Sequence, residues 1–369
     1  MPIRTRGLDT KNGGAVGTRT GEKQPPTESD VAALAGVSQS AVSRAFTPGA
    51  SVALETRKKI LAAARRLGYH PNLIARSLST KRSNIIGLAI SSLENPFYAQ
   101  VVKELSERLS ATGRHILLFA ASPGEAADPE IETFLSYQID ALILTATSPS
   151  KALVQQCRKS GVPVVLINRD TSLPGVSTVR GENRRAGEIV AAFLVAGGHK
   201  RFAFVGGTEM SSVSRDREAA FAAFIKARGK GPVVIRYGNY TFEGGAAATR
   251  SLLGLPRRPD AIFCASDYMA FAALDVARRE FGLTLGHDLS IVGFDDVAEA
   301  GHAAYDLTTF SQPPAALARE AVAIIDAQIA SPRARAERRE VHGELVVRGT
   351  ARAPSGGIVE SAGRKIWTP

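Results

Sequence analysis

Two patterns of hydrophobic and polar positions divide the chain into a short first part and a long second part. Between residues 28 and 67, apolar side chains recur every three or four positions, which is the spacing of short amphipathic helices. From residue 84 onward, continuous apolar runs alternate with amphipathic stretches, a pattern typical of parallel β-strands covered by helices on both faces. The apolar runs are "IIGLAI", "HILLFAA", "DALILTA", "VPVVLIN", "RFAFVGG", "GPVVIRY", "DAIFCAS" and "LSIVGF". We therefore predict an all-α head followed by an α/β core.

The predicted core is longer than one sheet comfortably holds. Residues 83 to 353 are expected to form two similar parallel-sheet subdomains that divide near residues 180 to 183. The amphipathic stretch from about residue 315 to 329 is expected to return to the first subdomain, and "HGELVVRGTAR" is expected to supply a last strand. Residues 354 to 369 are predicted to be a flexible tail.

The first 26 residues are rich in Gly, Thr, Lys and Arg and contain few large apolar side chains. Such a composition is typical of a disordered tail, and it lacks the apolar stretch of a secretion signal. No apolar run in the chain approaches the roughly 20 residues that span a bilayer. Cys157 and Cys264 lie in apolar segments, as expected of buried free thiols in a reducing compartment. We therefore expect a cytoplasmic protein with no membrane partner.

Charge is unevenly distributed along the chain. Residues 1 to 82 contain 14 Lys and Arg against 5 Asp and Glu, whereas the remaining 287 residues contain 32 against 30. A compact basic segment ahead of a near-neutral body favours a module that binds a polyanion. A basic surface that only faces solvent, without binding a polyanion, would give the same numbers of charged residues.

Within the predicted head, residues 27 to 70, three helices are expected. Gly36 can supply the positive φ that ends the first helix, and Ser38 stands where the N-cap of the second helix is expected. The apolar positions predicted to face the small core of the head are Val31, Leu34 and Ala35 in the first helix, and Leu54, Ile60, Leu61, Ala64 and Leu67 in the third.

The second helix, from Gln39 to about Phe46, has two chemically different faces. On a helical wheel, small polar side chains and one arginine share one side, and apolar side chains share the other. The polar side holds Gln39, Ser40, Ser43, Arg44 and Thr47, and the apolar side holds Ala41, Val42, Ala45 and Phe46. Short polar side chains allow a helix to approach a groove closely, and arginine can bind a guanine edge with two hydrogen bonds. The pattern predicts a helix-turn-helix unit whose second helix enters the major groove of DNA.

The elements DVA-x-x-AGVS, VSR, V-x-x-x-TR, LGY-x-PN and ARSL follow one another in this first part. In this order and spacing they resemble the head of the lactose-repressor (LacI/GalR) family of bacterial transcription regulators. The resemblance continues to about residue 353 through NPF-Y, GH-x-R, SD-x-MA and VGFDD, which are motifs of an effector-binding core similar to periplasmic binding proteins of type I. It implies a sequence-specific regulator, expected to be a repressor, whose operator affinity is controlled by a small effector bound between the core subdomains.

The resemblance also implies roles for single residues of the second helix. Gln39 and Ser40 would read base edges, and Arg44 would contact a base or a nearby phosphate. Ser38 and Ser43 would hold the DNA backbone. Two positions depart from the family pattern, because Glu28 stands where an apolar residue is usual and Thr47 where asparagine is common. The base contacts made near these two positions are therefore left open.

Residues 71 to 82, "PNLIARSLSTKR", are too short and too polar for a stable isolated helix, and an ordinary linker would look the same. The resemblance implies instead a hinge helix that folds on the operator and pairs with its copy in a second subunit. Leu78 would enter the minor groove as a wedge, with Ala75 packed beside it and Arg76 near the phosphates. We therefore expect a homodimer, or a higher oligomer, on a palindromic double-stranded operator in the nucleoid.

Polar and aromatic residues follow the ends of six predicted strands, in "SSLENPFYAQ", "INRD", "GGTEMSSVSRDR", "GNYTFEG", "ASDYMA" and "GFDD". Ligands of such sheets bind at the carboxyl ends of strands, so these segments predict a cleft between the subdomains. By the resemblance, the side chains that reach the effector are Phe97, Tyr98, Ser211, Arg217, Tyr240, Asp267 and Asp295. Phe97 and Tyr98 would stack on the effector and Asp295 would accept its hydrogen bonds. For Asp267, a ligand role and a helix N-cap role both remain open.

Serines and arginines near one rim of this cleft favour a hydroxylated molecule, either a sugar or an anionic derivative such as a sugar acid or sugar phosphate. Two other classes of protein account for less of the sequence. An exported solute-binding protein would explain the core but not the basic head. An enzyme would need a nucleophile, a metal cluster or a cofactor motif, and the chain contains neither G-x-G-x-x-G nor a P-loop. We expect no catalytic residue, no metal and no cofactor.

Overall fold

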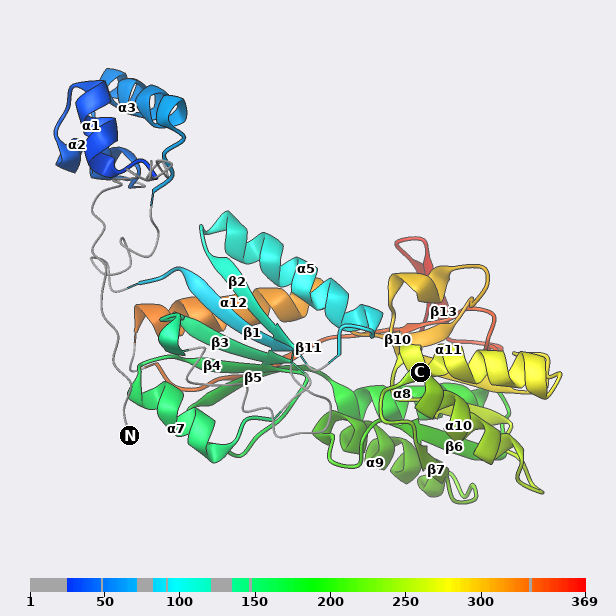
Figure 1. The fold of residues 1–369 in the computed structure, drawn as a ribbon. Coiled ribbons are helices and arrows are strands. Elements are labelled where there is room, and N and C mark those ends of the chain that lie inside the picture. The colour runs from blue at the N-terminus through cyan, green and yellow to red at the C-terminus, as the bar shows by residue number, and fades with distance from the viewer. Residues whose placement is uncertain are drawn as a thin grey trace, which may run out of the picture. The chain divides into compact units, whose positions relative to one another are not determined.

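The computed structural model describes residues 25–47, 49–71, 82–90, 92–120, 135–145, 148–331 and 334–369. The chain divides into two compact units, Met1–Arg76 and Ser77–Pro369, called the head and the core below (Figure 1). Residues 1 to 24 of the predicted tail and residues 72 to 81 of the predicted hinge lie outside the described residues.

The head contains the three predicted helices, α1 (Glu28–Ala35), α2 (Gln39–Ala45) and α3 (Leu54–Leu67). The turn between α1 and α2 is formed as predicted, because Gly36 has φ 66° and the Ser38 Oγ accepts a hydrogen bond from the Ala41 N–H at 3.3 Å. One buried side chain from each helix meets in the centre of the head, and these are Val31, Val42 and Ile60.

Three leucines of the head lie outside this small core, contrary to prediction. Leu34 is 41% exposed, Leu54 is 68% exposed and Leu67 is 36% exposed. Leu54 and Leu67 are the first and last residues of α3, and two short helices cannot cover both ends of a helix of 14 residues. The spacing of apolar residues predicts which side of α3 faces the other helices. It does not predict how much of the length of α3 those helices cover.

The first subdomain of the core contains a six-stranded sheet in the order β11-β5-β4-β3-β1-β2, in which every neighbouring pair is parallel. Its strands are β1 (Ile85–Ile90), β2 (His115–Ala120), β3 (Ala141–Thr145), β4 (Val164–Ile167), β5 (Val176–Gly181) and β11 (Arg338–Val341). Its helices are α5 (Pro96–Ala111), α7 (Lys151–Lys159) and α12 (Pro314–Ala330).

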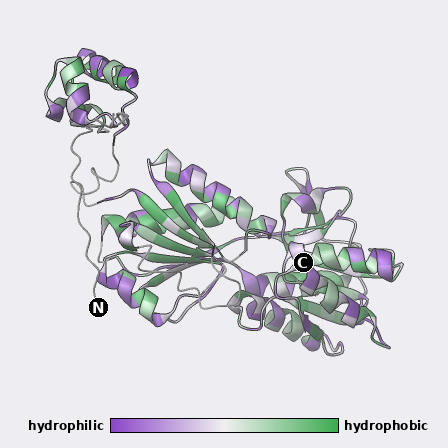
Figure 2. Ribbon diagram, viewed as in Figure 1, coloured by the Kyte–Doolittle hydropathy of each residue, from purple (hydrophilic) through white to green (hydrophobic). Residues whose placement is uncertain are grey.

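Both faces of this sheet are covered, as continuous apolar strands require. In β3, Ile143 packs in the cluster that contains the apolar side chains of α5 and α12. Its neighbours Leu142 and Leu144 pack in a second cluster with Leu153 of α7. Alternate residues of one strand therefore pack in two hydrophobic layers. Figure 2 shows largely hydrophobic central strands beside helices that contain both hydrophobic and hydrophilic residues.

The second subdomain contains an eight-stranded sheet in the order β13-β14-β12-β10-β9-β8-β6-β7. Five strands are parallel, namely β6 (Phe202–Gly206), β7 (Val234–Tyr237), β8 (Ala261–Cys264), β9 (Ser290–Asp295) and β10 (Thr308–Ser311). Three antiparallel strands follow β10 in the sheet, namely β12 (Leu345–Val346), β14 (Arg364–Trp367) and β13 (Ile358–Ser361). The helices are α8 (Asn183–Ala196), α9 (Ser212–Ala227), α10 (Phe242–Leu253) and α11 (Asp267–Asp275), with two short segments, η1 (Val276–Glu280) and η2 (Ala298–Gly301).

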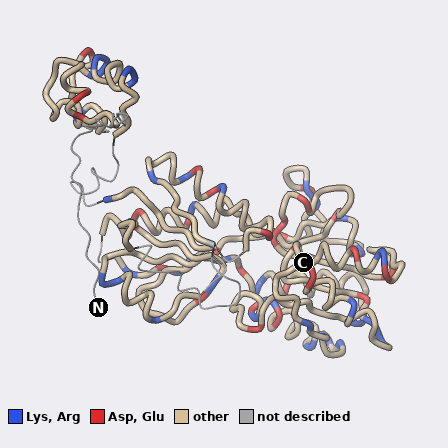
Figure 3. The backbone as a smooth tube through the Cα atoms, in the orientation of Figure 1, with Lys and Arg blue, Asp and Glu red and all other residues tan. Residues whose placement is uncertain are grey.

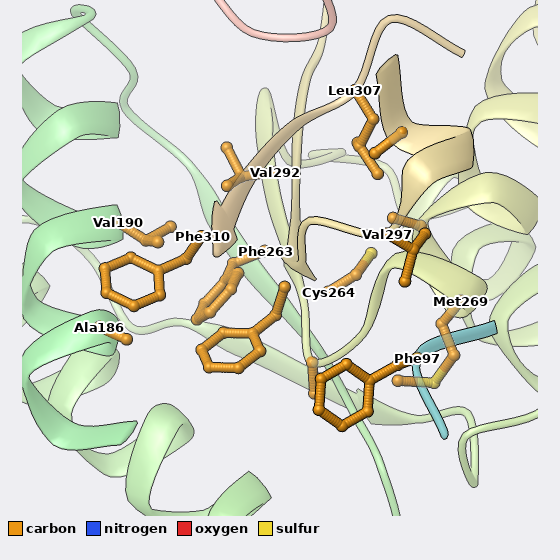
Figure 4. Close-up of a cluster of buried hydrophobic side chains, with 14 of the residues drawn as sticks. Phe97, Ala186, Val190, Phe263, Cys264, Met269, Val292, Val297, Leu307 and Phe310 are labelled. Carbon is orange, nitrogen blue, oxygen red and sulfur yellow. The ribbon is translucent and has the colours of Figure 1, made fainter. Parts of the chain in front are cut away.

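The second sheet is also buried between helices. Phe263 of β8 and Phe310 of β10 lie beside Ala186 and Val190 of α8 in a continuous buried cluster (Figure 4). Helices α8 and α9 pack very closely, because a Cβ on Gly187 would lie 2.5 Å from the carbonyl oxygen of Arg217. Only glycine fits there, and this contact fixes the part of α9 that carries Arg217.

The chain passes between the two subdomains three times, after β5, after β10 and after β11. The second and third connections are bonded to each other, since the Ser311 N–H donates to the Glu344 carbonyl at 2.7 Å and the Glu344 N–H donates to the Ser311 Oγ at 2.9 Å. The predicted α12 returns to the first subdomain and packs against α5 (Figure 1). The predicted fold class, a helix-turn-helix head with a core of two α/β subdomains, is confirmed.

The C-terminal residues 354 to 369 are not a flexible tail, and that prediction is wrong. They form the hairpin β13–β14, whose second strand pairs with β12. Trp367 is 5% exposed, stacks edge-on against Phe193 with ring centroids 5.5 Å apart, and donates from Nε1 to the Gly356 carbonyl at 3.1 Å. A polar, glycine-rich segment is held here by one aromatic anchor and by strand pairing.

Candidate DNA-binding helix and effector cleft

Helix α2 presents the predicted polar face to solvent. Gln39, Ser40, Ser43 and Arg44 are exposed, whereas Val42 and Ala45 on the opposite face are buried. The Arg44 Nε donates to the Ser40 carbonyl at 3.3 Å, and the Ser38 and Ser40 hydroxyls lie 3.0 Å apart. Ser38 also caps the helix, so a role at the DNA backbone would be additional to this structural one.

Thr47 differs from its neighbours on the polar face, because it is half-buried at the end of α2. Its hydroxyl donates to the Ser43 carbonyl at 3.0 Å, and its carbonyl accepts from an Arg57 guanidinium nitrogen at 3.4 Å. Both contacts tie the turn after α2 to the head itself.

Basic residues of the head are concentrated along α3 (Figure 3). They are Arg57, Lys58, Lys59, Arg65 and Arg66. Such residues can neutralise phosphates without reading sequence. The predicted hinge residues Ala75, Arg76 and Leu78 lie outside the described residues.

In the core, a small cavity lies where the carboxyl ends of several strands meet the first turns of α5 and α9. Five of the seven predicted effector residues line it, namely Phe97, Tyr98, Arg217, Tyr240 and Asp295. The other described lining residues are Asn95, Asn168, Val213, Ala265 and Ser266. Residues from both subdomains thus converge on one polar and aromatic cavity, which is the arrangement expected of a site for a small hydroxylated molecule.

The aromatic wall from the first subdomain is positioned by the start of α5. The Asn95 Oδ1 accepts a hydrogen bond from the Phe97 N–H at 3.0 Å, and Pro96 occupies the first helical position, where it is favoured. The rings of Phe97 and Tyr98 meet edge-to-face with centroids 5.2 Å apart. Burial raises the pKa of Tyr98 far above its usual range, so its hydroxyl stays protonated.

Tyr240 is held in the cavity by an unusual backbone turn. Asn239 and Tyr240 have φ values of 54° and 60°, in the left-handed region that few residues other than glycine adopt. The Tyr240 ring lies directly on Gly207, where a Cβ would approach the ring to 2.0 Å. Any other residue at position 207 would displace this ring from the cavity wall.

Arg217 is 2% exposed, and its guanidinium is held on three sides. Its Nε donates to the Asn183 Oδ1 at 2.8 Å, and a terminal nitrogen donates to the Ala265 carbonyl at 2.5 Å. Its Cζ lies over the Phe294 ring, 3.2 Å from the ring centroid. Burial lowers the pKa of Arg217, but an arginine remains charged in proteins.

Ser211 does not line the cavity but contacts Tyr240, which does. It is the N-cap of α9, and its hydroxyl lies 3.1 Å from the Tyr240 hydroxyl. It also accepts a hydrogen bond at 2.6 Å from Arg169, which follows β4 in the first subdomain. Ser211 therefore orients Tyr240 and links the two subdomains.

Asp295 ends β9 with φ 131° and is one of the residues that line the cavity. Its Oδ1 accepts a hydrogen bond from the Gln312 side chain at 3.3 Å. Burial, reinforced by the neighbouring Asp267, raises the pKa of Asp295 well above its ordinary value. When protonated, a carboxyl group can donate as well as accept a hydrogen bond.

Asp267 lies outside the cavity lining and is fully buried. Its carboxylate accepts hydrogen bonds from the Val297 N–H at 3.0 Å and from the Thr309 hydroxyl at 2.5 Å. The N-cap of α11 is Ser266, not Asp267, because the Ser266 hydroxyl accepts from the Met269 N–H at 3.3 Å. Through these hydrogen bonds, Asp267 holds in place the segments next to Asp295. Burial raises the pKa of Asp267 to about 7.

Sequence reasoning missed the two asparagines that line the cavity, Asn95 and Asn168, and Arg169 beside it. Asn168 and Arg169 follow β4 directly, in the segment "INRD", so their place after a strand was the available signal. Asparagine is equally common in turns of no functional importance, and Asn168 does have a positive φ of 57°.

A larger cavity of about 370 Å³ lies at the opposite, amino end of the first sheet, beside Arg82, Asp140, Val162 and Gln328. The strands of a parallel sheet direct ligand-binding loops to their carboxyl ends, so the smaller cavity is the better candidate. In the described conformation this smaller cavity has a volume of only about 10 Å³, which is room for about one water molecule.

A helix-turn-helix head and a two-subdomain core with a polar cavity define the class of ligand-responsive DNA-binding proteins. The family description "Bacterial regulatory proteins, lacI family" matches residues 27–72, and "Periplasmic binding protein-like domain" matches residues 191–351. The chain is 30% identical over 331 residues to the HTH-type transcriptional repressor CytR of Escherichia coli (strain K12), which covers 89% of this chain and 96% of that repressor. This protein belongs to the lacI family of bacterial regulatory proteins.

Two solved structures are similar to most of this chain. One is the lac repressor dimer bound to operator and the anti-inducer ONPF, with a TM-score of 0.78, 26% identity and coverage of 89% of this chain and 100% of that chain. The other is the complex of the transcriptional regulator CelR with cellobiose, with a TM-score of 0.66, 29% identity and coverage of 88% and 100%. These relatives are transcription regulators rather than enzymes. Within the described residues, every helix is too short or too polar to cross a membrane.

Proposed function

We propose that this protein is a transcription repressor that binds an operator through the exposed face of α2 and responds to a small effector in the cavity of the core. The observation that carries the proposal is the pairing, in one chain, of two chemically distinct surfaces. Helix α2 exposes short hydrogen-bonding side chains and one arginine without any acidic residue, and the core buries aromatic and polar side chains around a cavity.

On the operator, Gln39, Ser40 and Arg44 are proposed to contact base edges, and the basic residues of α3 to contact phosphates. Ser38, Ser43 and Thr47 would support these contacts. Leu78 would enter the minor groove, with Ala75 packed beside it and Arg76 near the phosphates. A homodimer on a palindromic site follows, because the wedge residues act in pairs and because a two-fold protein matches two half-sites. The lac repressor structure named above is itself a dimer on its operator.

The effector is proposed to be a sugar or a sugar acid. Phe97, Tyr98 and Tyr240 offer flat apolar faces for a sugar ring, and Arg217 and Asp295 offer hydrogen bonds to its substituents. Among the relatives, CelR was solved with cellobiose, and another is named the ribose operon repressor. A solute-binding protein without a regulatory role would share this cleft, but it would not need the head.

The DNA-binding assignment is tested by comparing Arg44→Ala with Arg65→Ala. Arg44→Ala should lower affinity for the operator by at least tenfold and relax the preference at one base position of each half-site, since a good paired base contact is worth about 1 to 3 kcal/mol. Arg65→Ala, on the basic side of α3, should weaken binding to all sequences about equally and lower the salt dependence. Selection of bound sequences from a random library, followed by titration at two salt concentrations, measures both effects.

The assignment of α2 as the reading helix fails if Arg44→Ala keeps the sequence preference and the affinity of the unmodified protein. The operator itself can be found by mapping the chromosomal binding sites of the full chain, and the neighbouring genes would also indicate the effector.

A further inference from the structure

The turn that brings Asp295 to the cavity has a strained backbone. Asp295 and Asp296 have φ values of 131° and 56°, and few residues other than glycine adopt either value. Two successive residues in such conformations persist only where the surrounding structure holds them. The contacts made by this turn therefore decide how Asp295 is presented to a ligand.

The Asp296 carboxylate lies between two arginines. Its Oδ1 accepts a hydrogen bond from Arg348 at 2.7 Å, and its Oδ2 accepts one from Arg364 at 3.2 Å. Arg348 belongs to the segment after β12 and also donates to the Leu307 carbonyl at 2.8 Å. Arg364 is the first residue of β14, so the C-terminal hairpin supplies one of the two groups that hold this turn.

Arg364 also reaches a connection between the subdomains. A second nitrogen of its guanidinium donates to the Glu344 carboxylate at 3.4 Å. Glu344 lies in the third passage of the chain between the subdomains and shares two hydrogen bonds with Ser311 in the second passage. The next residue, Gln312, donates from its N–H to the Asp295 carbonyl at 3.1 Å. These contacts form a closed network in which Arg364 joins the cavity turn to the third passage.

The hairpin that carries Arg364 lies outside the residues matched by the family's core domain, which end at residue 351. Its anchor, Trp367, is buried against Phe193, whereas the Arg364 side chain is 43% exposed. Replacing Arg364 leaves the anchor in place. The contact with Asp296 can therefore be removed without undocking the hairpin.

We propose that Arg364 is a positioning residue for the effector cavity, because it holds the turn that presents Asp295 and ties this turn to the third passage. Without Arg364, the turn would relax toward ordinary backbone conformations, and effector binding would have to restore the strained one. The C-terminal hairpin thus strengthens effector binding without touching the effector. This inference rests on the proposed function of the cavity as the effector site.

The first test needs no effector. Hydrogen exchange of the full chain, measured by mass spectrometry, reports how often the network opens. Arg364→Gln should accelerate exchange at the turn and the two passages by about threefold or more, in line with the loss of partly exposed ion pairs, and should leave the buried strand β8 unchanged. The amides to follow are those of Val297, Ser311, Gln312 and Glu344.

Two further variants separate a positioning role from a general effect on stability. Arg364→Lys keeps a positive charge between the two carboxylates and should restore most of the protection. Lys365→Gln removes the same charge from the next, exposed residue of β14, whose side chain points to the opposite face of the sheet, so it should change nothing at the turn. Faster exchange throughout the second sheet in Arg364→Gln would overturn the inference.

The second test measures effector binding by calorimetry, with cellobiose, D-ribose and D-glucuronate as probes. A probe that binds the unmodified protein should bind Arg364→Gln about threefold to fivefold more weakly and Lys365→Gln equally well. An unchanged affinity in Arg364→Gln, or unchanged exchange at the turn, would overturn the inference and leave the effector site in place. If no probe binds the unmodified protein, that result counts against a sugar effector, whereas the exchange measurement still decides the inference.

Discussion

Asp267 and Asp295 are carboxyl groups whose surroundings make the charged form unfavourable. Both are buried beside the cavity, and Asp267 raises the pKa of Asp295 by its negative charge. Asp267 itself is held by Val297 and Thr309, which favour its charged form, but desolvation is the larger effect. Both acids of the cleft are therefore protonated more readily than exposed carboxyl groups.

This gives the free energy of unfolding a pH dependence that Asp267→Asn should reduce. The pKa of Asp267 is about 7 in the folded protein and near the ordinary 3.8 in the unfolded chain, so the folded state holds a proton that the unfolded state has already released. The contribution of Asp267 to the free energy of unfolding should therefore be largest below about pH 4. It should fall as the pH rises from about 4 to about 7, by up to about 1.4 kcal/mol per pH unit. Urea unfolding at several pH values measures the slope.

Asp288→Asn provides the control, because the pKa of this carboxyl is lowered by its hydrogen bonds to the Thr284 backbone and to His287. Asp288 is charged in both states above pH 4, so its variant should give a curve parallel to that of the unmodified protein. A curve for Asp267→Asn that is also parallel would contradict the buried protonation equilibrium.

Single residues also mark the limit of what the sequence predicts. Phe97, Tyr98 and Arg217 could be placed near a cleft because they follow strand ends, and the structure brings them together. The sequence could not tell whether Ser266 or Asp267 caps α11, since either side chain can accept the N-cap hydrogen bond. Asp267 is not the cap because its carboxylate accepts hydrogen bonds from the Val297 N–H and the Thr309 hydroxyl, which are distant in sequence.

At the scale of elements, the strongest predictions rested on long apolar runs. All eight predicted strands are present, because a strand buried on both faces must be apolar throughout. The hairpin β13–β14 escaped prediction because "GGIVESAGRKIWTP" is polar, and only Trp367 and Ile366 are buried in β14. The structure of this hairpin depends on its pairing with β12, and no local sequence pattern predicts that pairing.

Trp367→Ala should therefore destabilise the core. The indole is buried against Phe193 and donates one hydrogen bond, so its removal should lower the free energy of unfolding by about 3 to 5 kcal/mol, the usual cost of truncating a large buried aromatic side chain. Val359→Ala, in the same hairpin but 50% exposed, should change stability little. Chemical denaturation followed by circular dichroism compares the two, and equal effects would mean that the hairpin is not docked through Trp367.

At the scale of the whole core, the first turn of α9 joins the two subdomains. Arg169 donates to the Ser211 hydroxyl, the Asp170 N–H donates to the Ser212 hydroxyl at 3.1 Å, and Arg180 of β5 binds Asp216 at 3.0 Å. With a cavity of only about 10 Å³, a molecule the size of a sugar cannot enter unless these contacts open, since sites for small molecules usually measure about 300 to 1,000 Å³.

Asp216→Asn should accelerate effector association by a few-fold. The change removes the charge that binds Arg180 across the two subdomains, and a partly exposed ion pair is worth up to about 1 kcal/mol. The open state then becomes more populated before the effector arrives. Glu218→Gln is the control on the same helix, because Glu218 accepts from Tyr237 within one subdomain. Stopped-flow binding measures both rates, and an unchanged rate in Asp216→Asn would show that this ion pair does not limit opening.

The three passages of the chain between the subdomains also determine the order in which the protein is completed during synthesis. The head consists of contacts among residues 27 to 69 and can fold as soon as this segment leaves the ribosome. The first sheet lacks α12 and β11 until residue 341 has been made, and the second lacks β14 until residue 367. A message cut short near its end would therefore yield a chain with a finished DNA-reading head and no finished effector-sensing core, and its exposed strands would be a target for chaperones and proteases.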